Sequence, residues 1–150
     1  MRITLKNLQR KIRISPARIR KIAYNIAPPA SLNNLKLSLY FVENDVIKKL
    51  NRKFFGRNRL TDVISFRLSS DCAEVFVAPC VAKSNALAFK TGFPEELYRC
   101  VIHGILHVFG YKDGAKKEKE RMWRAQEKIL KKMAKDTVCL NPKSKTLNPK

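Results

Sequence analysis

Acidic residues are scarce in this sequence. Asp and Glu together number 12 against 32 Lys and Arg in 150 residues, which gives a formal net charge of +20. The first acid of the chain is Glu43, so nine basic residues precede any negative charge. Because basic side chains release condensed counterions when nucleic acid binds, the composition favours nucleic acid as the partner over an acidic membrane surface.

Long apolar runs, a secretory leader and paired cysteines are also lacking. No stretch approaches the roughly 18 uninterrupted apolar residues of a membrane span, and the start MRITLKNLQRKIRI has no apolar signal core. Cys72, Cys80, Cys100 and Cys139 are widely spaced and form no C-x-x-C pair. We therefore expect a cytoplasmic protein with reduced cysteines, no membrane association and no disulfide-linked partner. The acid-free, Arg-containing start leaves an organelle transit peptide as the alternative.

Enough apolar material is present for one folded domain. Apolar residues make up 45% of the chain and include eight Phe, which excludes a wholly disordered protein. The length fits a single domain, which we place at residues 1–135. Residues 136–150 are expected to form a basic low-complexity tail, because the run Leu-Asn-Pro-Lys occurs twice there.

Strand and helix signals alternate along this domain. The N-terminal region is expected to be strand, with Ser15-Pro16 as the N-cap and first turn of a helix and Asn44 as the cap of the next one. The last helix presents Met122, Gln126, Ile129 and Met133 at helical spacing. The expected strands are residues 3–14, 35–41, 62–68 and 74–79, and the expected helices are residues 16–26, 44–54, 81–90, 94–108 and 116–134. This order predicts an α/β (α+β) domain with one mixed sheet and helices packed on it.

The two histidines of the chain lie four residues apart. Residues four apart share one face of a helix, so His103 and His107 can direct both imidazoles at one point. Gly110 can turn the chain back one turn later, which brings the Asp113 carboxylate within reach. Two His and one Asp with an open fourth position are typical of a catalytic zinc site at the end of this central helix.

Two observations qualify this interpretation. A pair of His at this spacing also occurs as two satisfied, partly buried side chains without a metal. Gly104 stands where H-E-x-x-H metalloproteases carry their general-base Glu, which disfavours peptide hydrolysis.

Two separated blocks of the sequence, residues 103–111 and residues 50–66 with Leu50-Asn51 and TDVISF, resemble the YbeY family of single-domain, metal-dependent endoribonucleases. The run HGILHVFGY at 103–111 is similar to the family signature H-G-x-L-H-x-x-G-Y-D-H, and Leu50-Asn51 with TDVISF at 61–66 is similar to its L-N-x-x-[YF]-R-x-x-x-x-P-T-D-V-L-S-F block. The strand AEVFV at 73–77 also resembles the family. The resemblance implies an α/β sandwich, a zinc held by three side chains, and Ser65 in the catalytic cleft with His103 and His107. It also implies ribosomal RNA and the small ribosomal subunit as partners, in ribosomal RNA maturation or ribosome quality control.

The sequence departs from the family pattern at four positions. Asp113 stands in place of the third His, and Lys112 in place of the Asp before it. The carboxylate can still ligate zinc, although it shifts the preference toward Mn or Mg. Phe55 replaces an Arg expected to contact the RNA backbone, and Leu60 replaces the Pro before Thr61.

The metal site and the charge together predict hydrolysis of a phosphodiester. A metal held by His103, His107 and Asp113 would lower the pKa of its bound water, and basic residues would track the backbone of single-stranded RNA. The RNA-binding candidates are Arg57, Arg59, Arg18, Arg20 and Lys21, each of which taken singly is also an ordinary solvated charge. No base-reading aromatic signature stands out. Two alternatives to the endoribonuclease remain: a non-catalytic or weakened RNA- or ribosome-binding protein, and a metallohydrolase of another substrate.

Overall fold

The computed structural model describes residues 1–140, with side chains described through residue 136. Within that range strands and helices alternate as far as the second helix, after which two consecutive strands are followed by three helices, and a short 3₁₀ turn at Ala30–Leu32 precedes the second strand. The strands are β1 (Arg2–Asn7), β2 (Lys36–Phe41), β3 (Val63–Arg67) and β4 (Cys72–Val77). The helices are α1 (Pro16–Asn25), α2 (Asn44–Phe55), α3 (Pro79–Phe89), α4 (Phe93–Val108) and α5 (Lys116–Leu140). The expected α/β domain with one mixed sheet is confirmed.

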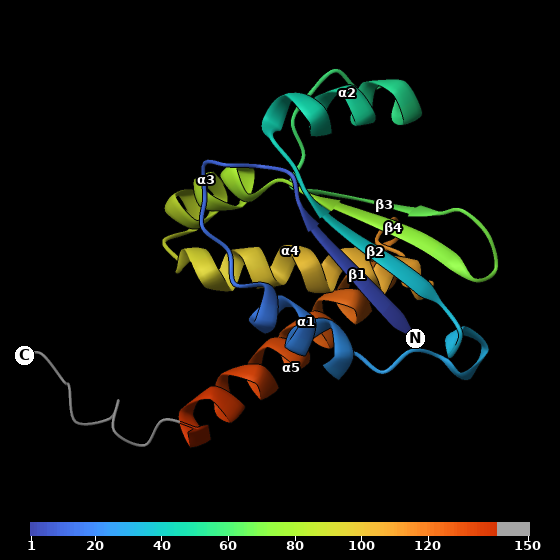
Figure 1. The fold of residues 1–150 in the computed structure, drawn as a ribbon, viewed down its shortest axis with the longest axis vertical. Helices are drawn as coiled ribbons and strands as arrows, with labels where there is room; N and C mark the ends of the chain where they lie inside the picture. Colours follow the sequence, from blue (N-terminus) through green and yellow to red (C-terminus); the bar gives the residue numbers. More distant parts are fainter. Residues whose placement is uncertain (141–150) are drawn as a thin grey trace, which may run out of the picture.

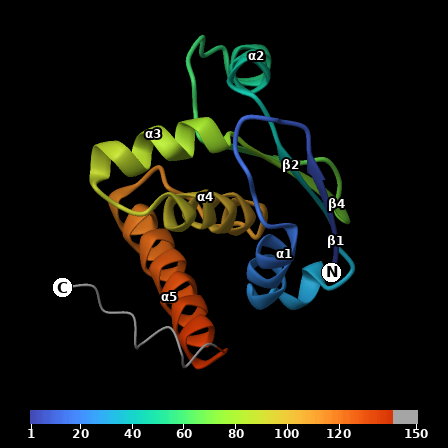
Figure 2. The ribbon, with the colours of Figure 1, turned by 60° about the vertical axis from the view of Figure 1, so that its left-hand side comes forward.

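The strands form one sheet in the order β1-β2-β4-β3. β1, β2 and β4 run parallel, and the edge strand β3 pairs antiparallel with β4. α2 lies alone on one side of the sheet, whereas α1 and α4 lie on the other side with α5 beyond α4 (Figure 1). The view in Figure 2 shows the same layers and shows α5 running away from the sheet below α4. The sheet is therefore covered on both faces, as its parallel strands require.

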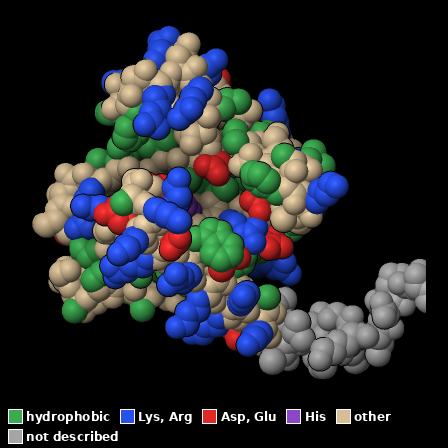
Figure 3. All heavy atoms as spheres, turned by 180° about the vertical axis from the view of Figure 1, so that it is seen from behind, with side chains coloured by type: hydrophobic (Ala, Val, Ile, Leu, Met, Phe, Trp, Pro, Cys, Tyr) green, Lys and Arg blue, Asp and Glu red, His purple; other side chains and the backbone are tan. Residues whose placement is uncertain are grey.

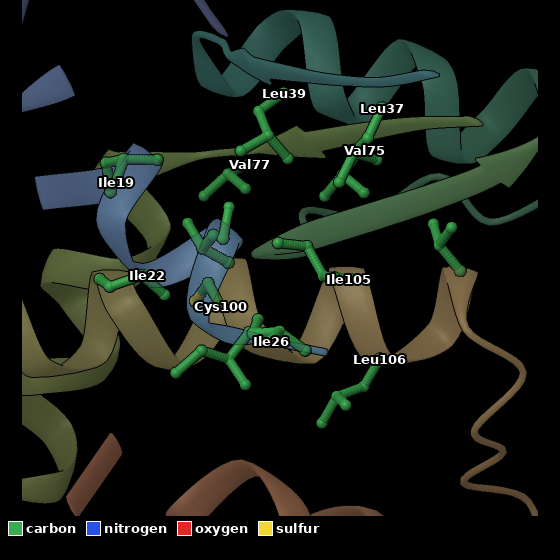
Figure 4. Close-up of a cluster of buried hydrophobic side chains, with 14 of the residues drawn as sticks. Ile19, Ile22, Ile26, Leu37, Leu39, Val75, Val77, Cys100, Ile105 and Leu106 are labelled. Atoms are coloured by element: carbon green, nitrogen blue, oxygen red, sulfur yellow. The ribbon is translucent and has the colours of Figure 1, made fainter. Parts of the chain in front are cut away.

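Alternation along the strands separates two cores. Leu37 and Leu39 of β2 and Val75 of β4 are buried on the α4 side, where they meet residues of α1 and α4 such as Ile22 and Ile105 (Figure 4). The opposite face carries a smaller cluster under α2, built on Val42, Ile47, Ile64 and Ala78. Successive side chains of β3 therefore point to opposite faces of the sheet. Ile64 and Phe66 pack in the α2 cluster, whereas Val63 packs in the α4 core and Ser65 bonds to α4.

The expected N-terminal strand is too long. β1 ends at Asn7, and Leu8 is 61% exposed. The buried side chain of Gln9 accepts from the Lys11 and Ile12 backbone N–H groups and donates to the Ile12 carbonyl. A side chain that bonds its own backbone neighbours in this way competes with the strand ladder. Ile12 and Ile14 therefore belong to the connection before α1.

Two predicted element boundaries were also wrong. Asn44 is the first residue of α2 and does not cap it, because the N-cap is Glu43 and no side-chain cap bond forms there. Pro79 opens α3 and does not end a strand, since its fixed φ and missing N–H suit the first turn of a helix. Ser15 does cap α1, as expected, by accepting from the Arg18 backbone N–H.

The expected tail and cysteines are only partly covered by the described residues. α5 extends to Leu140, six residues past its predicted end at 134, and residues 141–150 of the expected tail lie outside the described range. Cys72, Cys80 and Cys100 are free. Among the described residues, none of the helices combines the length and the apolar character that crossing a bilayer requires.

Candidate metal centre

α4 presents both histidines on one face. His103 and His107 are half-buried, and their Nε2 atoms lie 3.1 Å apart. The two rings meet edge to face, with centroids 4.7 Å apart. Two imidazole nitrogens at this separation need a shared proton or a shared cation between them. The i, i+4 spacing has therefore brought together the two donors that the sequence predicted.

The turn after α4 returns the chain to the histidines. Gly110 has φ +98°, which favours glycine, and its N–H donates to the His107 carbonyl over 3.0 Å. The Tyr111 N–H donates to the Leu106 carbonyl over 3.0 Å, which closes the helix end. Asp113 then lies with its Oδ2 3.3 Å from His107 Nε2 and 3.7 Å from His103 Nε2.

Each of the two imidazoles is oriented by a hydrogen bond at its Nδ1 atom. His107 Nδ1 donates to the Tyr111 carbonyl over 3.0 Å, and since that carbonyl can only accept, the neutral ring has its lone pair at Nε2. His103 Nδ1 lies 3.0 Å from the Oε1 of Gln126 on α5, which fixes the same tautomer. Such partners are the usual support of metal-ligating histidines, because they orient the ring and raise its basicity.

The surroundings favour the neutral form of His103. Burial lowers the pKa of its imidazole below the ordinary value of 6.5, and the neighbouring His107 lowers the pKa further. The Gln126 hydrogen bond opposes these two effects. A neutral imidazole is the form that ligates a metal, so the site is prepared for a cation at neutral pH.

The donor set fits a small divalent cation. Four ligands at 2.0–2.1 Å around zinc in a tetrahedron stand about 3.3–3.4 Å apart. The three separations here, 3.1, 3.3 and 3.7 Å, bracket that value. His103, His107 and Asp113 also form the cluster of possible ligand atoms found among the described residues. Three protein donors leave one position open, as in catalytic zinc sites.

Gly104 lets α4 approach the sheet at the level of the histidines. A Cβ at this position would stand 2.5 Å from Val75 Cγ1 and 2.8 Å from Val63 Cγ2, distances that side-chain carbons do not tolerate. Ser65 Oγ donates to the Gly104 carbonyl over 2.8 Å. The structure thus explains the missing protease glutamate, because position 104 faces the packed sheet and has no room for a side chain.

A cleft of about 450 Å³ opens beside the metal centre. Figure 3 shows a histidine side chain at the bottom of a hollow, with Lys and Arg as well as Asp and Glu side chains around it. The residues that line the cleft include Asn51, Phe55, Arg57, Ser65, Phe66, His107 and Asp113. The cleft therefore brings Ser65, His107 and Asp113 together with Arg57, one of the predicted RNA-binding residues. His103 does not line the cleft and reaches it only through His107 and Asp113.

The remaining RNA-binding candidates lie at different places. The Arg59 carbonyl accepts from Asn51 Nδ2 over 3.0 Å, so Arg59 is tied to the end of α2 near the cleft. Arg18, Arg20 and Lys21 are exposed on α1. Arg18 and Lys21 line a separate groove between α1 and α5, which also contains Glu95 and Glu127.

The hydrogen-bond partners of the two histidines were not predicted from the sequence. Gln126 is buried in a helix face that otherwise carries Met122 and Ile129, so a lone polar residue at an apolar position was the available signal. The Tyr111 carbonyl is a backbone group and gives no sequence signal of its own.

Comparison with known proteins identifies the family of this chain. A family model described as Endoribonuclease YbeY matches residues 4–134. The chain belongs to the YbeY endoribonuclease family. The YbeY endoribonuclease of Thermotoga maritima is 35% identical to it over 102 residues, which are 66% of this chain and 68% of that protein. The YbeY endoribonuclease of Chlorobium phaeovibrioides is 28% identical over 134 residues, 87% of this chain and 90% of that protein.

A solved structure also shares the YbeY fold of this chain. The solution structure of a Thermotoga maritima protein matches it with a TM-score of 0.56 and 29% identity, covering 82% of this chain and 81% of that one. As a YbeY endoribonuclease the chain is a metal-dependent hydrolase that acts on RNA. The His103, His107 and Asp113 group is its candidate metal site.

Proposed function

We propose that this YbeY endoribonuclease hydrolyses phosphodiesters of single-stranded ribosomal RNA, with one zinc ion held by His103, His107 and Asp113. The observation that carries the proposal is the convergence of these three donors, 3.1–3.7 Å apart, beside a cleft that His107 and Asp113 line, in a chain of net charge +20. The setting we propose is the maturation or quality control of ribosomes in the cytoplasm or an organelle, with the small ribosomal subunit as the partner.

The residues at and beside the cleft have different roles in this proposal. Gln126 and the Tyr111 carbonyl accept hydrogen bonds from the Nδ1 atoms of His103 and His107, which leaves both Nε2 atoms facing Asp113. A divalent cation bound there supplies a Lewis acid for a phosphate oxygen and lowers the pKa of a bound water. Arg57, on the same cleft, offers a charge for the neighbouring phosphate.

Ser65 has a positioning role in this proposal. Its hydroxyl donates a hydrogen bond to the Gly104 carbonyl, one residue from His103, so Ser65 fixes α4 against β3 at the level of the metal site.

The Asp113 carboxylate is a harder ligand than a third imidazole would be. Mn and Mg therefore compete with zinc more than they would at a site of three histidines.

Metal content of the parent and of three variants tests the proposal. We expect the parent to bind about one equivalent of zinc and to cleave single-stranded RNA. Asp113→His should hold zinc at least as tightly, because imidazole replaces a carboxylate at the third position. Asp113→Ala should hold it less tightly, and His107→Ala should lose both zinc and cleavage. Metal analysis after dialysis and a gel assay of RNA fragments measure these outcomes.

The same experiment separates the alternatives. A parent that binds RNA but gains no cleavage with zinc, Mn or Mg would identify a YbeY-like protein that has lost catalysis. A parent that needs the metal but spares RNA would indicate a metallohydrolase of another substrate. Cleavage by His107→Ala at the parent rate would contradict the proposed centre.

A further inference from the structure

Three phenylalanines form an exposed aromatic patch beside the cleft. Phe54 and Phe55 end α2, and they are 54% and 52% exposed although both are large apolar side chains. Phe66 of β3 lies beneath them, on the sheet face that α2 covers. Phe55 and Phe66 both line the cleft that contains His107 and Asp113. We call Phe54, Phe55 and Phe66 the aromatic patch.

The rings of the patch support one another. The Phe55 and Phe66 rings are nearly parallel, with an interplanar angle of 16° and centroids 6.0 Å apart. Phe54 meets Phe66 edge to face at 4.9 Å, and Phe66 in turn meets Phe76 of β4 at 5.9 Å. Phe55 is thus braced from one side by a ring anchored on the sheet, while about half of its surface stays open to solvent.

The end of α2 also places the patch next to cations. Gly56, with φ +66°, terminates the helix directly after Phe55 and starts the loop that carries Arg57 along the cleft. Lys53 Nζ stands 5.4 Å from the Phe54 ring centroid. Between positions 46 and 61 every charged side chain is basic: Lys48, Lys49, Arg52, Lys53, Arg57 and Arg59. The nearby acid Glu74, opposite Phe66 on β4, lies 3.5 Å from the Tyr40 hydroxyl, which donates to it.

Exposed rings among cations are the elements of a single-strand binding surface. Every base has a π-face that stacks on an aromatic side chain, and basic residues follow the backbone between the bases. An apolar patch for a protein partner would not require so many cations around it, whereas a polyanionic strand is attracted by them. The charge around the patch therefore favours RNA as its occupant.

We propose that Phe55 stacks on an unpaired base of the RNA strand next to the scissile phosphate, with Phe66 bracing the ring. This inference rests on the proposed function and deepens it, because it makes an unstacked, single-stranded base part of what the cleft recognises. A base held inside a duplex presents no free face to Phe55. The site therefore prefers single strands and loops to paired RNA.

Replacement of Phe55 tests the inference. Phe55→Ala should raise the KM for single-stranded RNA about 5- to 150-fold, which corresponds to the loss of one base–ring stack, and should leave kcat nearly unchanged. Phe55→Leu keeps an apolar side chain but lacks a π-face, so it should behave like Phe55→Ala. Phe55→Tyr should retain the parent KM. Phe89→Ala is the matched control, because Phe89 is 68% exposed at the end of α3.

A strand without bases isolates the stacking contribution. Fluorescence anisotropy with labelled oligoadenylate and with an abasic strand of equal length should show that Phe55→Ala binds the abasic strand as well as the parent does. The slope of affinity against salt should be the same for both proteins, since no charge is removed.

The outcomes distinguish this inference from the proposed function. A parent that neither binds nor cleaves RNA overturns both. A parent that cleaves RNA, together with Phe55→Ala at the parent KM, overturns only the stacking. A parent-like Phe55→Leu also overturns it, because an apolar surface without a ring then suffices. Thermal unfolding of each variant identifies any that fails to fold, and Phe55→Leu then decides the outcome.

Discussion

At the scale of single residues, Gly104 sets the distance between α4 and the sheet. Gly104→Ala would bring its Cβ to 2.5 Å from Val75 Cγ1, so the helix or the strand must move. We expect a loss of about 1–3 kcal/mol in the free energy of unfolding, the usual cost of overpacking a core. Zinc affinity should fall as well, because His103 precedes Gly104 on the same turn. Denaturant unfolding and zinc titration measure both effects.

Gly92→Ala is the control for this substitution. Gly92 precedes α4 with φ −72°, which alanine adopts, and nothing lies within 4 Å of an added Cβ. Its free energy of unfolding should change by less than about 1 kcal/mol. Equal losses at positions 92 and 104 would contradict a steric role for Gly104.

The residues found from sequence are those whose geometry is local. His103, His107 and Asp113 lie within eleven residues on one helix and its closing turn, so helical spacing and a glycine sufficed to predict their convergence. Gln126 and Phe66 come from other elements, and their positions depend on how α5 and β3 pack. No local pattern predicts that packing, which is why the histidine support and the aromatic patch emerged only from the structure.

At the scale of elements, α5 completes the metal centre through Gln126. Gln126→Ala removes the acceptor of the His103 Nδ1 proton and should weaken zinc binding about 10- to 100-fold, as loss of such a partner usually does. Gln126→Glu keeps an acceptor and should retain affinity. Lys128→Ala, at an exposed position of the same helix, is the matched control. Competition with a chelator measures the affinities, and parent-like binding by Gln126→Ala would contradict this support.

Element types were easier to predict than element ends. All five helices and the four strands of the described chain were expected, because apolar periodicity extends over whole elements. The ends depend on single side chains with two roles. The Gln9 side chain forms hydrogen bonds with its backbone neighbours, so the strand ends before the apolar pattern does. Pro79 suits the first turn of a helix as well as the end of a strand. The third wrong boundary, at Asn44, fell one residue from the true cap.

At the scale of the whole molecule, the five candidate RNA-binding residues form two separate groups. Arg57 lines the cleft and Arg59 is tied to α2 beside it, next to the edge strand β3. Arg18, Arg20 and Lys21 lie on α1, which packs near the opposite edge strand β1. Three strand spacings separate these edges, about 14 Å. A short RNA in the cleft therefore meets the first group, and a longer RNA is needed to reach the second.

Salt dependence distinguishes the two groups. Replacing Arg57 and Arg59 by Ala should lower the slope of log affinity against log salt by about 1.4 for a short single strand, since each lost contact with single-stranded RNA is worth about 0.7. Replacing Arg18, Arg20 and Lys21 by Ala should leave that slope unchanged and lower it only for long ribosomal RNA. Anisotropy titrations over a series of salt concentrations measure both slopes. An unchanged slope for the Arg57 and Arg59 variant would mean that these two residues do not contact the RNA phosphates. A lower slope for the α1 variant on the short strand would instead mean that the path crosses α1.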